Sequence, residues 1–198
     1  DLYQTHWQEE QTPREETMSA LMDLKKEGKI RAIGVSNATS DHMKDYISVS
    51  AIDSDQEKYS MLDPEIESDQ LPFCRERNIA VLAYSPLAQG LLTGKMTPDR
   101  EFPEGDLRRD NPRFSVENRK RVNWMLEQFK PVAEDKDATL AQLTIAWTFH
   151  QSGLTHVLCG ARNPDQSVEN AKAGDIELTQ DDLTLMNKAI DKYRNEQQ

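Results

Sequence analysis

The fold is decided by the stretch Ile79-Ala-Val-Leu-Ala-Tyr84, which follows a segment of helical spacing over residues 68–77. A short apolar run bounded by polar and turn residues is typical of a buried strand. Comparable runs, each separated by helical segments, occur at residues 1–7, 30–35, 52–56 and 155–160. Regular alternation of strands and helices predicts a parallel α/β sheet, with extra helices late in the chain.

Several residues are expected to start, bend or end the helices. Thr12 is expected to cap the first helix, with Pro13 at its first position, Glu15 completing a capping box and Gly28 ending it. A later helix is expected to kink at Pro131. Further helix starts are expected at Thr139, Asn163 and Thr179. Residues 85–114 read as a long loop, and loops of this length are usually functional or mobile.

Composition excludes several classes of function. The 198 residues, about one domain, carry 24 Lys plus Arg against 35 Asp plus Glu, a net charge of −11. An acidic balance argues against a nucleic-acid partner. No apolar run is long enough for a membrane span, and no signal peptide is visible. The two distant cysteines, Cys74 and Cys159, favour a reduced, cytoplasmic compartment. No spacing of His, Cys, Asp or Glu indicates a metal site.

In parallel α/β sheets, ligands bind at the carboxyl ends of the strands. The residues at those ends are polar or aromatic: His6, Trp7, Ser36, Asn37, Gln56, Tyr84, Ser85, Gly160 and Arg162. Ser36, Asn37 and Gln56 together suit a carboxamide, which needs both donors and acceptors. For any one of these positions, a solvated strand end explains the residue equally well.

The last strand end carries the most information. Gly160 permits close approach of a ligand, and Arg162 offers a fork suited to phosphate. Asn163 and Pro164 start a helix whose amides attract anions. These features predict a phosphate site; the alternative is a capped helix beside a solvated arginine.

Two aromatic side chains have competing interpretations. Tyr84 can stack on a flat heterocycle, or it is a core residue whose hydroxyl reaches water. His6 can donate to a carbonyl oxygen or move a proton, although a single histidine is more often structural.

Four motifs, in register along the chain, carry a family resemblance. They are Asp1-Leu-Tyr-Gln-Thr-His-Trp7, Ile33-Gly-Val-Ser-Asn37, Ala83-Tyr-Ser-Pro-Leu-Ala-Gln-Gly-Leu-Leu-Thr-Gly-Lys95 and Gly160-Ala-Arg-Asn-Pro-Asp-Gln-Ser-Val-Glu-Asn170. Together they resemble the aldo-keto reductase family, in its bacterial branch that is also similar to potassium-channel β subunits. The resemblance implies a (β/α)₈ TIM barrel that uses NADP(H) to reduce aldehydes or ketones, sugar-type carbonyls included.

The resemblance also implies a role for each matching residue. His6 matches the catalytic histidine of the family's tetrad, Trp7 a wall of the substrate site and Tyr84 the aromatic under the nicotinamide ring. Ser36, Asn37 and Gln56 match the carboxamide contacts, and Arg162 matches the 2′-phosphate contact. The other implied cofactor residues are Ser85, Pro86, Leu87, Gln89, Gly90 and Lys95 of a strap over the pyrophosphate, Gly160, Gln166, Glu169 and Asn170 toward the adenosine, and Arg113.

The match begins at the family's fourth strand. Residues 1–198 are therefore expected to form the C-terminal part of a single barrel, with strands 4–8 and auxiliary helices. The first three βα units, about 100 residues, are expected to lie outside this sequence, together with the tetrad's Asp, Tyr and Lys. Five strands of eight leave an open sheet edge. Cys159 stands where the family commonly has proline.

Three functions follow, in order of preference. The first is an NADPH-dependent reductase of a small carbonyl substrate, whose oligomeric state is left open. The second is an NADP(H)-binding regulatory subunit with little turnover. The third is an unrelated phosphate-binding barrel enzyme.

Overall fold

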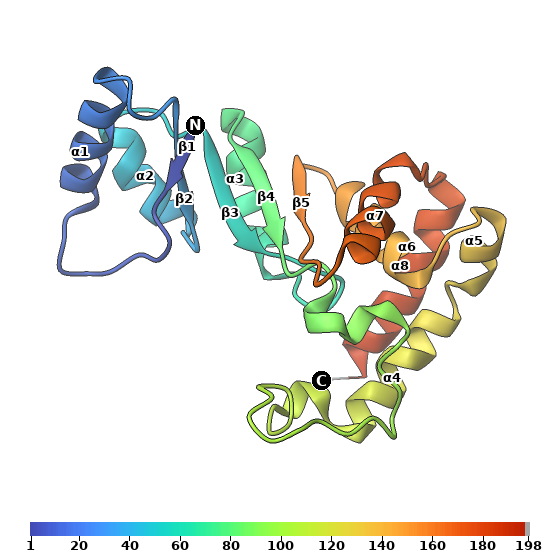
Figure 1. Cartoon of the computed structure of the whole chain (residues 1–198). Helices are drawn as coiled ribbons and strands as arrows, with labels where there is room; N and C mark the ends of the chain where they lie inside the picture. Colours follow the sequence, from blue (N-terminus) through green and yellow to red (C-terminus); the bar gives the residue numbers. More distant parts are fainter. Residues whose placement is uncertain (197–198) are drawn as a thin grey trace. The chain divides into compact units, whose positions relative to one another are not determined.

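The computed structural model describes residues 1–196, and five strands form its one sheet. These are β1 (Leu2–Gln4), β2 (Ala32–Ser36), β3 (Ser54–Lys58), β4 (Ala80–Tyr84) and β5 (His156–Leu158). The strands pair in sequence order, and every neighbouring pair is parallel (Figure 1). The predicted parallel α/β sheet is confirmed. Four of the strands are shorter than the runs that indicated them, and β3 lies two residues later than the predicted 52–56.

Helices follow or connect the strands. They are α1 (Arg14–Lys26), α2 (Ser40–Val49), α3 (Gln70–Arg77), α4 (Val116–Glu127), α5 (Lys130–Asp135), α6 (Leu140–Phe149), α7 (Pro164–Lys172) and α8 (Gln180–Asn195). Short 3₁₀ turns are η1 (Glu65–Ser68), η2 (Ala88–Thr93), η3 (Pro112–Phe114) and η4 (Ala173–Asp175).

The chain divides into two compact units. The sheet unit comprises Asp1–Tyr59, Asp63–Tyr84 and Gln151–Leu158, and it holds all five strands with α1, α2 and α3. The helical unit comprises Ser60–Leu62, Ser85–His150 and the residues from Cys159 onward, with α4 to α8. Each is described by itself below.

The core of the sheet unit lies under the middle of the sheet. Ile33, Val35 and Val81 are fully buried strand residues. Met18 of α1 and Met43 of α2 are also fully buried. Burying each such side chain contributes about 1.5–3 kcal/mol. This packing fixes the register of the strands, so the polar residues that follow neighbouring strands come to one edge of the sheet.

The outer strand β1 leaves apolar side chains uncovered. Leu2 and Tyr3 are 39% and 54% exposed, and β1 pairs with β2 alone among the described strands. The expected open edge is thus present at this end of the sheet.

The core of the helical unit is built around α6. Its residues from Ala141 to Thr148 are all buried, so the helix is covered on every side. Helix α6 contacts η2, α5, α7 and η4, and α4 packs on α8. Inside this core the Trp147 indole donates to Asn187 Oδ1 at 2.8 Å.

The expected cap at Thr12 was wrong. Helix α1 begins at Arg14, and Pro13 is its N-cap residue without a side-chain cap. The Thr12 amide donates instead to the Glu9 carboxylate at 2.8 Å, which places Thr12 in a turn before the helix. The helix ends as predicted, with Gly28 at φ +74°.

Pro131 does not kink a continuous helix. Helix α4 ends at Glu127, and Pro131 lies in the first turn of α5, where its missing N–H costs no hydrogen bond. The three other predicted starts are confirmed. Side-chain oxygens of Thr139, Asn163 and Thr179 accept from the amides of Gln142, Gln166 and Asp182.

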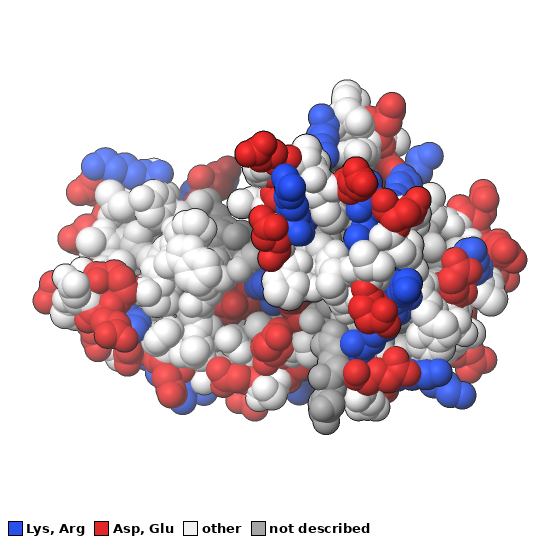
Figure 2. Space-filling view, turned by 90° about the horizontal axis from the view of Figure 1, so that it is seen from below, with Lys and Arg blue, Asp and Glu red and all other residues white. Residues whose placement is uncertain are grey.

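Surface charge is mixed. Figure 2 shows acidic and basic side chains interspersed over the face it draws, without a broad basic patch among the described residues there. Within residues 1–196, no helix is both long enough and apolar enough to span a membrane.

Candidate functional site

The structure brings four predicted residues of the sheet unit together at the strand ends, and Asn37 joins them. The Tyr84 hydroxyl donates to Asn37 Oδ1 at 2.8 Å. Asn37 Nδ2 donates to the His6 carbonyl at 2.9 Å and to Ser36 Oγ at 3.1 Å. Both amide hydrogens of Asn37 are therefore in use, and its oxygen keeps one lone pair for a further donor.

Gln56 supplies backbone to the same cluster. Its carbonyl accepts from Ser36 Oγ at 2.7 Å and from the Asn37 amide at 3.2 Å. Asn37 has φ +53°, a left-handed conformation that asparagine tolerates better than most residues. Gln56, expected at a strand end, lies in the middle of β3, and its backbone shapes the loop that presents Asn37.

Tyr84 lies at the end of β4 and is partly buried. Burial, and then the charges of Glu57 and Asp63, raise the pKa of Tyr84 above its ordinary value. The phenol therefore stays protonated at neutral pH and acts as the donor to Asn37.

His6 and Trp7 carry exposed side chains just beyond β1. Their ring centroids are 5.9 Å apart, and Trp7 is 64% exposed. The His6 backbone is held by Asn37, while its imidazole is exposed. This combination leaves the ring accessible to a ligand on a fixed backbone.

Sequence reasoning missed Gln8, which ties three segments of the sheet unit together. Gln8 Nε2 donates to the Ser36 carbonyl at 3.1 Å, and the Tyr46 hydroxyl donates to Gln8 Oε1 at 2.8 Å. Its place two residues after His6 was the available signal.

Sequence reasoning also missed two buried carboxyls on β3. Asp55 is fully buried and Glu57 is 5% exposed. Burial raises the pKa of both, and for Asp55 the Glu57 charge adds to the effect. Burial and the same carboxylates raise the pKa of Cys74, so its thiol stays protonated. The sequence did offer an indication: Ser54-Asp-Gln-Glu-Lys58 places charged residues in a strand, and charges buried there need polar partners.

In the helical unit, the predicted strap has an unusual backbone. Ser85, Ala88 and Gln89 have φ of +59°, +48° and +55°, and Gly90 has φ +92°. Non-glycine residues in this region are costly and cluster at ligand clamps. The segment is anchored by Leu92, which is fully buried and whose carbonyl accepts from Thr144 Oγ1 at 3.2 Å.

Pro86 and Leu87 complete this turn. Pro86 is buried, and the Leu87 carbonyl accepts from the amides of Gly90 and Leu92 at 2.9 and 3.2 Å. These bonds close the strap on itself.

Lys95 and Glu169, predicted for different parts of the cofactor, lie together. Lys95 Nζ is 3.8 Å from Glu169 Oε2. Thr139 Oγ1 donates to Glu169 Oε1 at 3.1 Å, and Gln142 Nε2 donates to the Glu169 carbonyl at 2.9 Å. The start of α6 therefore positions Glu169 on α7.

The turn before α7 is closed by the helix's own side chains. The Arg162 amide donates to Gln166 Oε1 at 2.8 Å, and Asn170 Nδ2 donates to the Gly160 carbonyl at 3.2 Å. A Cβ added at Gly160 meets nothing within 4 Å, so the space beside it is open. Arg162, two residues after Gly160, is exposed.

An acidic group of the 85–114 loop lies within electrostatic range of Arg162. The Asp106 carboxylate accepts from Arg108 Nε at 2.9 Å and Nη2 at 2.6 Å. These bonds hold the pKa of Asp106 well below its usual range, and the Arg162 charge lowers it further. Arg113 lies in η3, where its amide donates to Asn111 Oδ1 at 3.0 Å.

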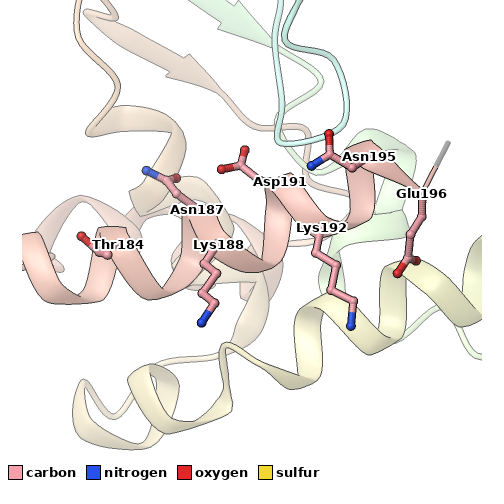
Figure 3. A pocket seen from close by; sticks show the side chains of 7 residues that line it. All are labelled: Thr184, Asn187, Lys188, Asp191, Lys192, Asn195 and Glu196. Carbon is pink, nitrogen blue, oxygen red and sulfur yellow. The ribbon is translucent and has the colours of Figure 1, made fainter. Parts of the chain in front are cut away.

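A separate hollow runs along α8. Its lining residues, shown in Figure 3, are Thr184, Asn187, Lys188, Asp191, Lys192, Asn195 and Glu196. None is a predicted site residue, and Lys192 Nζ lies 4.2 Å from the centre of the Trp124 ring. Across residues 1–196, no group of three or more His, Cys, Asp or Glu is placed to hold a metal ion.

Comparison with known proteins gives consistent relatives. The NADH-specific methylglyoxal reductase of Escherichia coli is 44% identical over 189 residues, 94% of this chain and 57% of that protein. The aldo-keto reductase yakc [NADP(+)] of Schizosaccharomyces pombe is 31% identical over 194 residues, covering 96% of this chain and 57% of that protein. The structure of a glycerol dehydrogenase from Gluconobacter oxydans superimposes with a TM-score of 0.92 at 32% identity, over 98% of this chain and 59% of that one.

The chain spans less than two thirds of the length of each of these relatives. Its fold is of the (β/α)₈ barrel class, of which the described residues hold five parallel strands. The Aldo/keto reductase family model matches residues 1–191. The chain therefore belongs to the aldo/keto reductase family.

Proposed function

We propose that this chain is part of an NADPH-dependent oxidoreductase that reduces aldehydes or ketones, sugar-type carbonyls included, to alcohols. Family membership supports the reaction class. The observation that carries the proposal is the strand-end cluster in which Asn37 joins Tyr84, Ser36 and the His6 carbonyl. Such a cluster offers a planar ring, an amide oxygen and an exposed imidazole.

The residues of the sheet unit fit the nicotinamide end. The free lone pair of Asn37 Oδ1 suits the carboxamide N–H, with Ser36 and Gln56 beside it, and the Tyr84 ring suits the face of the nicotinamide. When bound, a reduced nicotinamide supplies a hydride to the carbonyl carbon. His6 is proposed to orient and polarise the carbonyl oxygen, and Trp7 to form one wall of the substrate site.

The residues of the helical unit fit the phosphates and adenosine. The strap has left-handed backbone at Ser85, Ala88 and Gln89, a strain typical of ligand clamps, and Lys95 and Arg162 add positive charge. Gly160, two residues before Arg162, has open space beside it. Gln166, Glu169 and Asn170 are proposed for the adenosine end, and Arg113 as a further contact.

The coenzyme is proposed to be NADP(H) because of Arg162, whose guanidinium suits a 2′-phosphate. The relatives differ on this point: one is named NADH-specific and another NADP(+). Measuring both coenzymes is therefore the first test of the proposal.

We propose that residues 1–198 are the C-terminal part of a single barrel. The tetrad's Asp, Tyr and Lys then come from outside this sequence, and the Tyr delivers the proton to the carbonyl oxygen. This chain alone is not expected to perform the reduction efficiently. The two free cysteines, Cys74 and Cys159, support the cytoplasm as the proposed compartment.

The test is a titration of the full-length protein with NADPH and NADH, followed by turnover with a panel of aldehydes, ketones and sugars. We expect tighter NADPH binding and turnover of at least one carbonyl class. Binding without turnover favours the regulatory-subunit alternative, and binding of neither coenzyme refutes the proposal.

A further inference from the structure

Two carboxyl groups on β3 have no part in the proposed cofactor contacts. Asp55 is fully buried and Glu57 is 5% exposed. Because side chains alternate along a strand, the two share one face of β3, and Gln56 lies on the other. Buried carboxyls are expensive unless they have polar partners, so their partners indicate why the fold keeps them.

Glu57 holds the loop that carries Asn37. Glu57 Oε1 accepts from the Ala38 amide at 2.7 Å, in a fully buried hydrogen bond. The Gln56 carbonyl already accepts from Ser36 Oγ and from the Asn37 amide. Gln56 and Glu57 of β3 thus accept hydrogen bonds from Asn37 and from the residue on each side of it, Ser36 and Ala38.

The position of the Asn37 side chain depends on that backbone. At φ +53° it reaches the Tyr84 hydroxyl on one side and the His6 carbonyl on the other. A relaxed backbone at Asn37 turns the side chain away from both. The peptide planes on either side of the Asn37 Cα are held by the Gln56 carbonyl and by Glu57, so these two acceptors together restrict φ and ψ of Asn37.

We infer that Glu57 is a positioning residue: by accepting from the Ala38 amide it keeps Asn37 left-handed, so that its side chain meets Tyr84 and the His6 carbonyl. This inference rests on the proposed function, in which Asn37 and Tyr84 bind the nicotinamide.

The surroundings of the pair place a proton on Asp55. Cys74 Sγ lies 3.9 Å from Asp55 Oδ2, and the charge of Arg77, on the same helix as Cys74, acts on the Cys74 thiol. Burial and the Glu57 charge raise the pKa of Asp55, so Asp55 is the member that holds a proton. Burial raises the pKa of Glu57 as well, and the hydrogen bonds from the Ala38 amide and from Asp55 offset part of that effect.

The experiment compares Glu57→Leu and Glu57→Gln in the full-length protein. Glu57→Leu leaves the Ala38 amide unsatisfied, and we expect its hydrogen exchange to rise and NADPH affinity to fall by about 10-fold each. Glu57→Gln keeps a neutral acceptor, and its NADPH affinity is expected within about 3-fold of the wild type. The affinity for 2′,5′-ADP, which lacks nicotinamide, is expected to stay unchanged in both.

Asp69→Asn is the matched control. The Asp69 carboxylate accepts from the Ser40 amide at 3.0 Å, two residues farther from Asn37. We expect its NADPH affinity to equal that of the wild type. A comparable loss in Asp69→Asn overturns the assignment to Glu57.

Two further results overturn the inference. One is unchanged NADPH affinity in Glu57→Leu, and the other is an equal loss of NADPH and 2′,5′-ADP, which indicates general damage. If the wild type binds no nicotinamide nucleotide, the proposed function fails by itself. In that case the Ala38 exchange rate and the Asn37 side-chain amide resonances still decide whether Glu57 positions Asn37, and unchanged values in Glu57→Leu refute it.

Discussion

The sheet unit and the helical unit hold their predicted site residues in different ways. In the sheet unit, Asn37, Tyr84, Ser36 and the His6 carbonyl bind one another across three strand ends. In the helical unit, the hydrogen bonds around Arg162 stay within the turn before α7, and its guanidinium is exposed.

The site residues of the sheet unit are preorganised, whereas those around Arg162 in the helical unit need a ligand to complete their contacts. Side chains that already bind one another lose little entropy when a ligand arrives, so they favour a fixed orientation. An exposed arginine and open space beside Gly160 supply charge and room instead. We therefore expect orientation, and with it turnover, to depend on the sheet unit, and coenzyme choice to depend on the helical unit.

The largest effect is expected from His6→Ala in the full-length protein. Removing one oriented donor lowers kcat by about 100-fold, while NADPH affinity changes little because only the His6 carbonyl joins the cluster. Steady-state kinetics and coenzyme titration measure the two effects. Unchanged kcat removes His6 from the reaction.

Arg162→Ala tests the helical unit. Loss of a charge-assisted contact to the 2′-phosphate is expected to weaken NADPH binding on the order of 30-fold and NADH binding much less. Fluorescence titration with both coenzymes gives the ratio. Equal weakening of both contradicts a 2′-phosphate contact at Arg162.

Asn37→Ala breaks the preorganised cluster through its backbone. A left-handed alanine costs about 1–2 kcal/mol, so urea unfolding is expected at lower concentration. Asn78→Ala is the control, because Asn78 has φ +55° at the end of α3 and no part in the site. The two variants are expected to lose similar stability, but only Asn37→Ala loses NADPH affinity. Matching NADPH affinities contradict the role of the cluster.

The last two predictions concern stability and not turnover or coenzyme binding, at two carboxyls whose pKa values shift in opposite directions. The pKa of Asp55 is raised to about 9, so its folded state gains a proton and stability falls as pH rises from about 4 toward 9. Asp55→Asn removes this decline, whose slope is at most about 1.4 kcal/mol per pH unit. Urea unfolding between pH 5 and pH 9 measures it, and parallel curves for wild type and variant contradict the burial effect.

At Asp106, the expected change of stability with pH has the opposite sign. The pKa of Asp106 is lowered by Arg108, so the carboxylate stabilises the folded state at neutral pH, and this stabilisation is lost as pH falls below about 4. Asp106→Asn is therefore expected to differ from wild type at pH 7 and to approach it in acid. A gap that widens in acid contradicts the Arg108 interaction.

Much of the fold followed from local patterns. Apolar runs such as 79–84 predicted the strands, and the caps at Thr139, Asn163 and Thr179 were found because their side chains bond within one turn. The capping box expected at Thr12 does not form, because the Thr12 amide donates to Glu9 and not to Glu15. Glu9 and Glu15 are both close to Thr12 in sequence, and the sequence pattern alone does not show which carboxylate accepts from its amide.

The motifs also identified the loops that contribute to the site, though not the bonds within it. Ile33-Gly-Val-Ser-Asn37 marked Asn37, but only the structure joined it to Tyr84, 47 residues later. The structure also explains the glycine at position 34, because a Cβ there overlaps Ser54 Oγ on the neighbouring strand.

The order and type of elements, the acidic charge and the family motifs were readable from residue order, because each arises from neighbours along the chain. The burial of Asp55 and Glu57, the left-handed Asn37 and the link between Lys95 and Glu169 came only with the folded coordinates. These features arise between segments far apart in sequence, where packing sets both the distance and the protonation of the groups that meet.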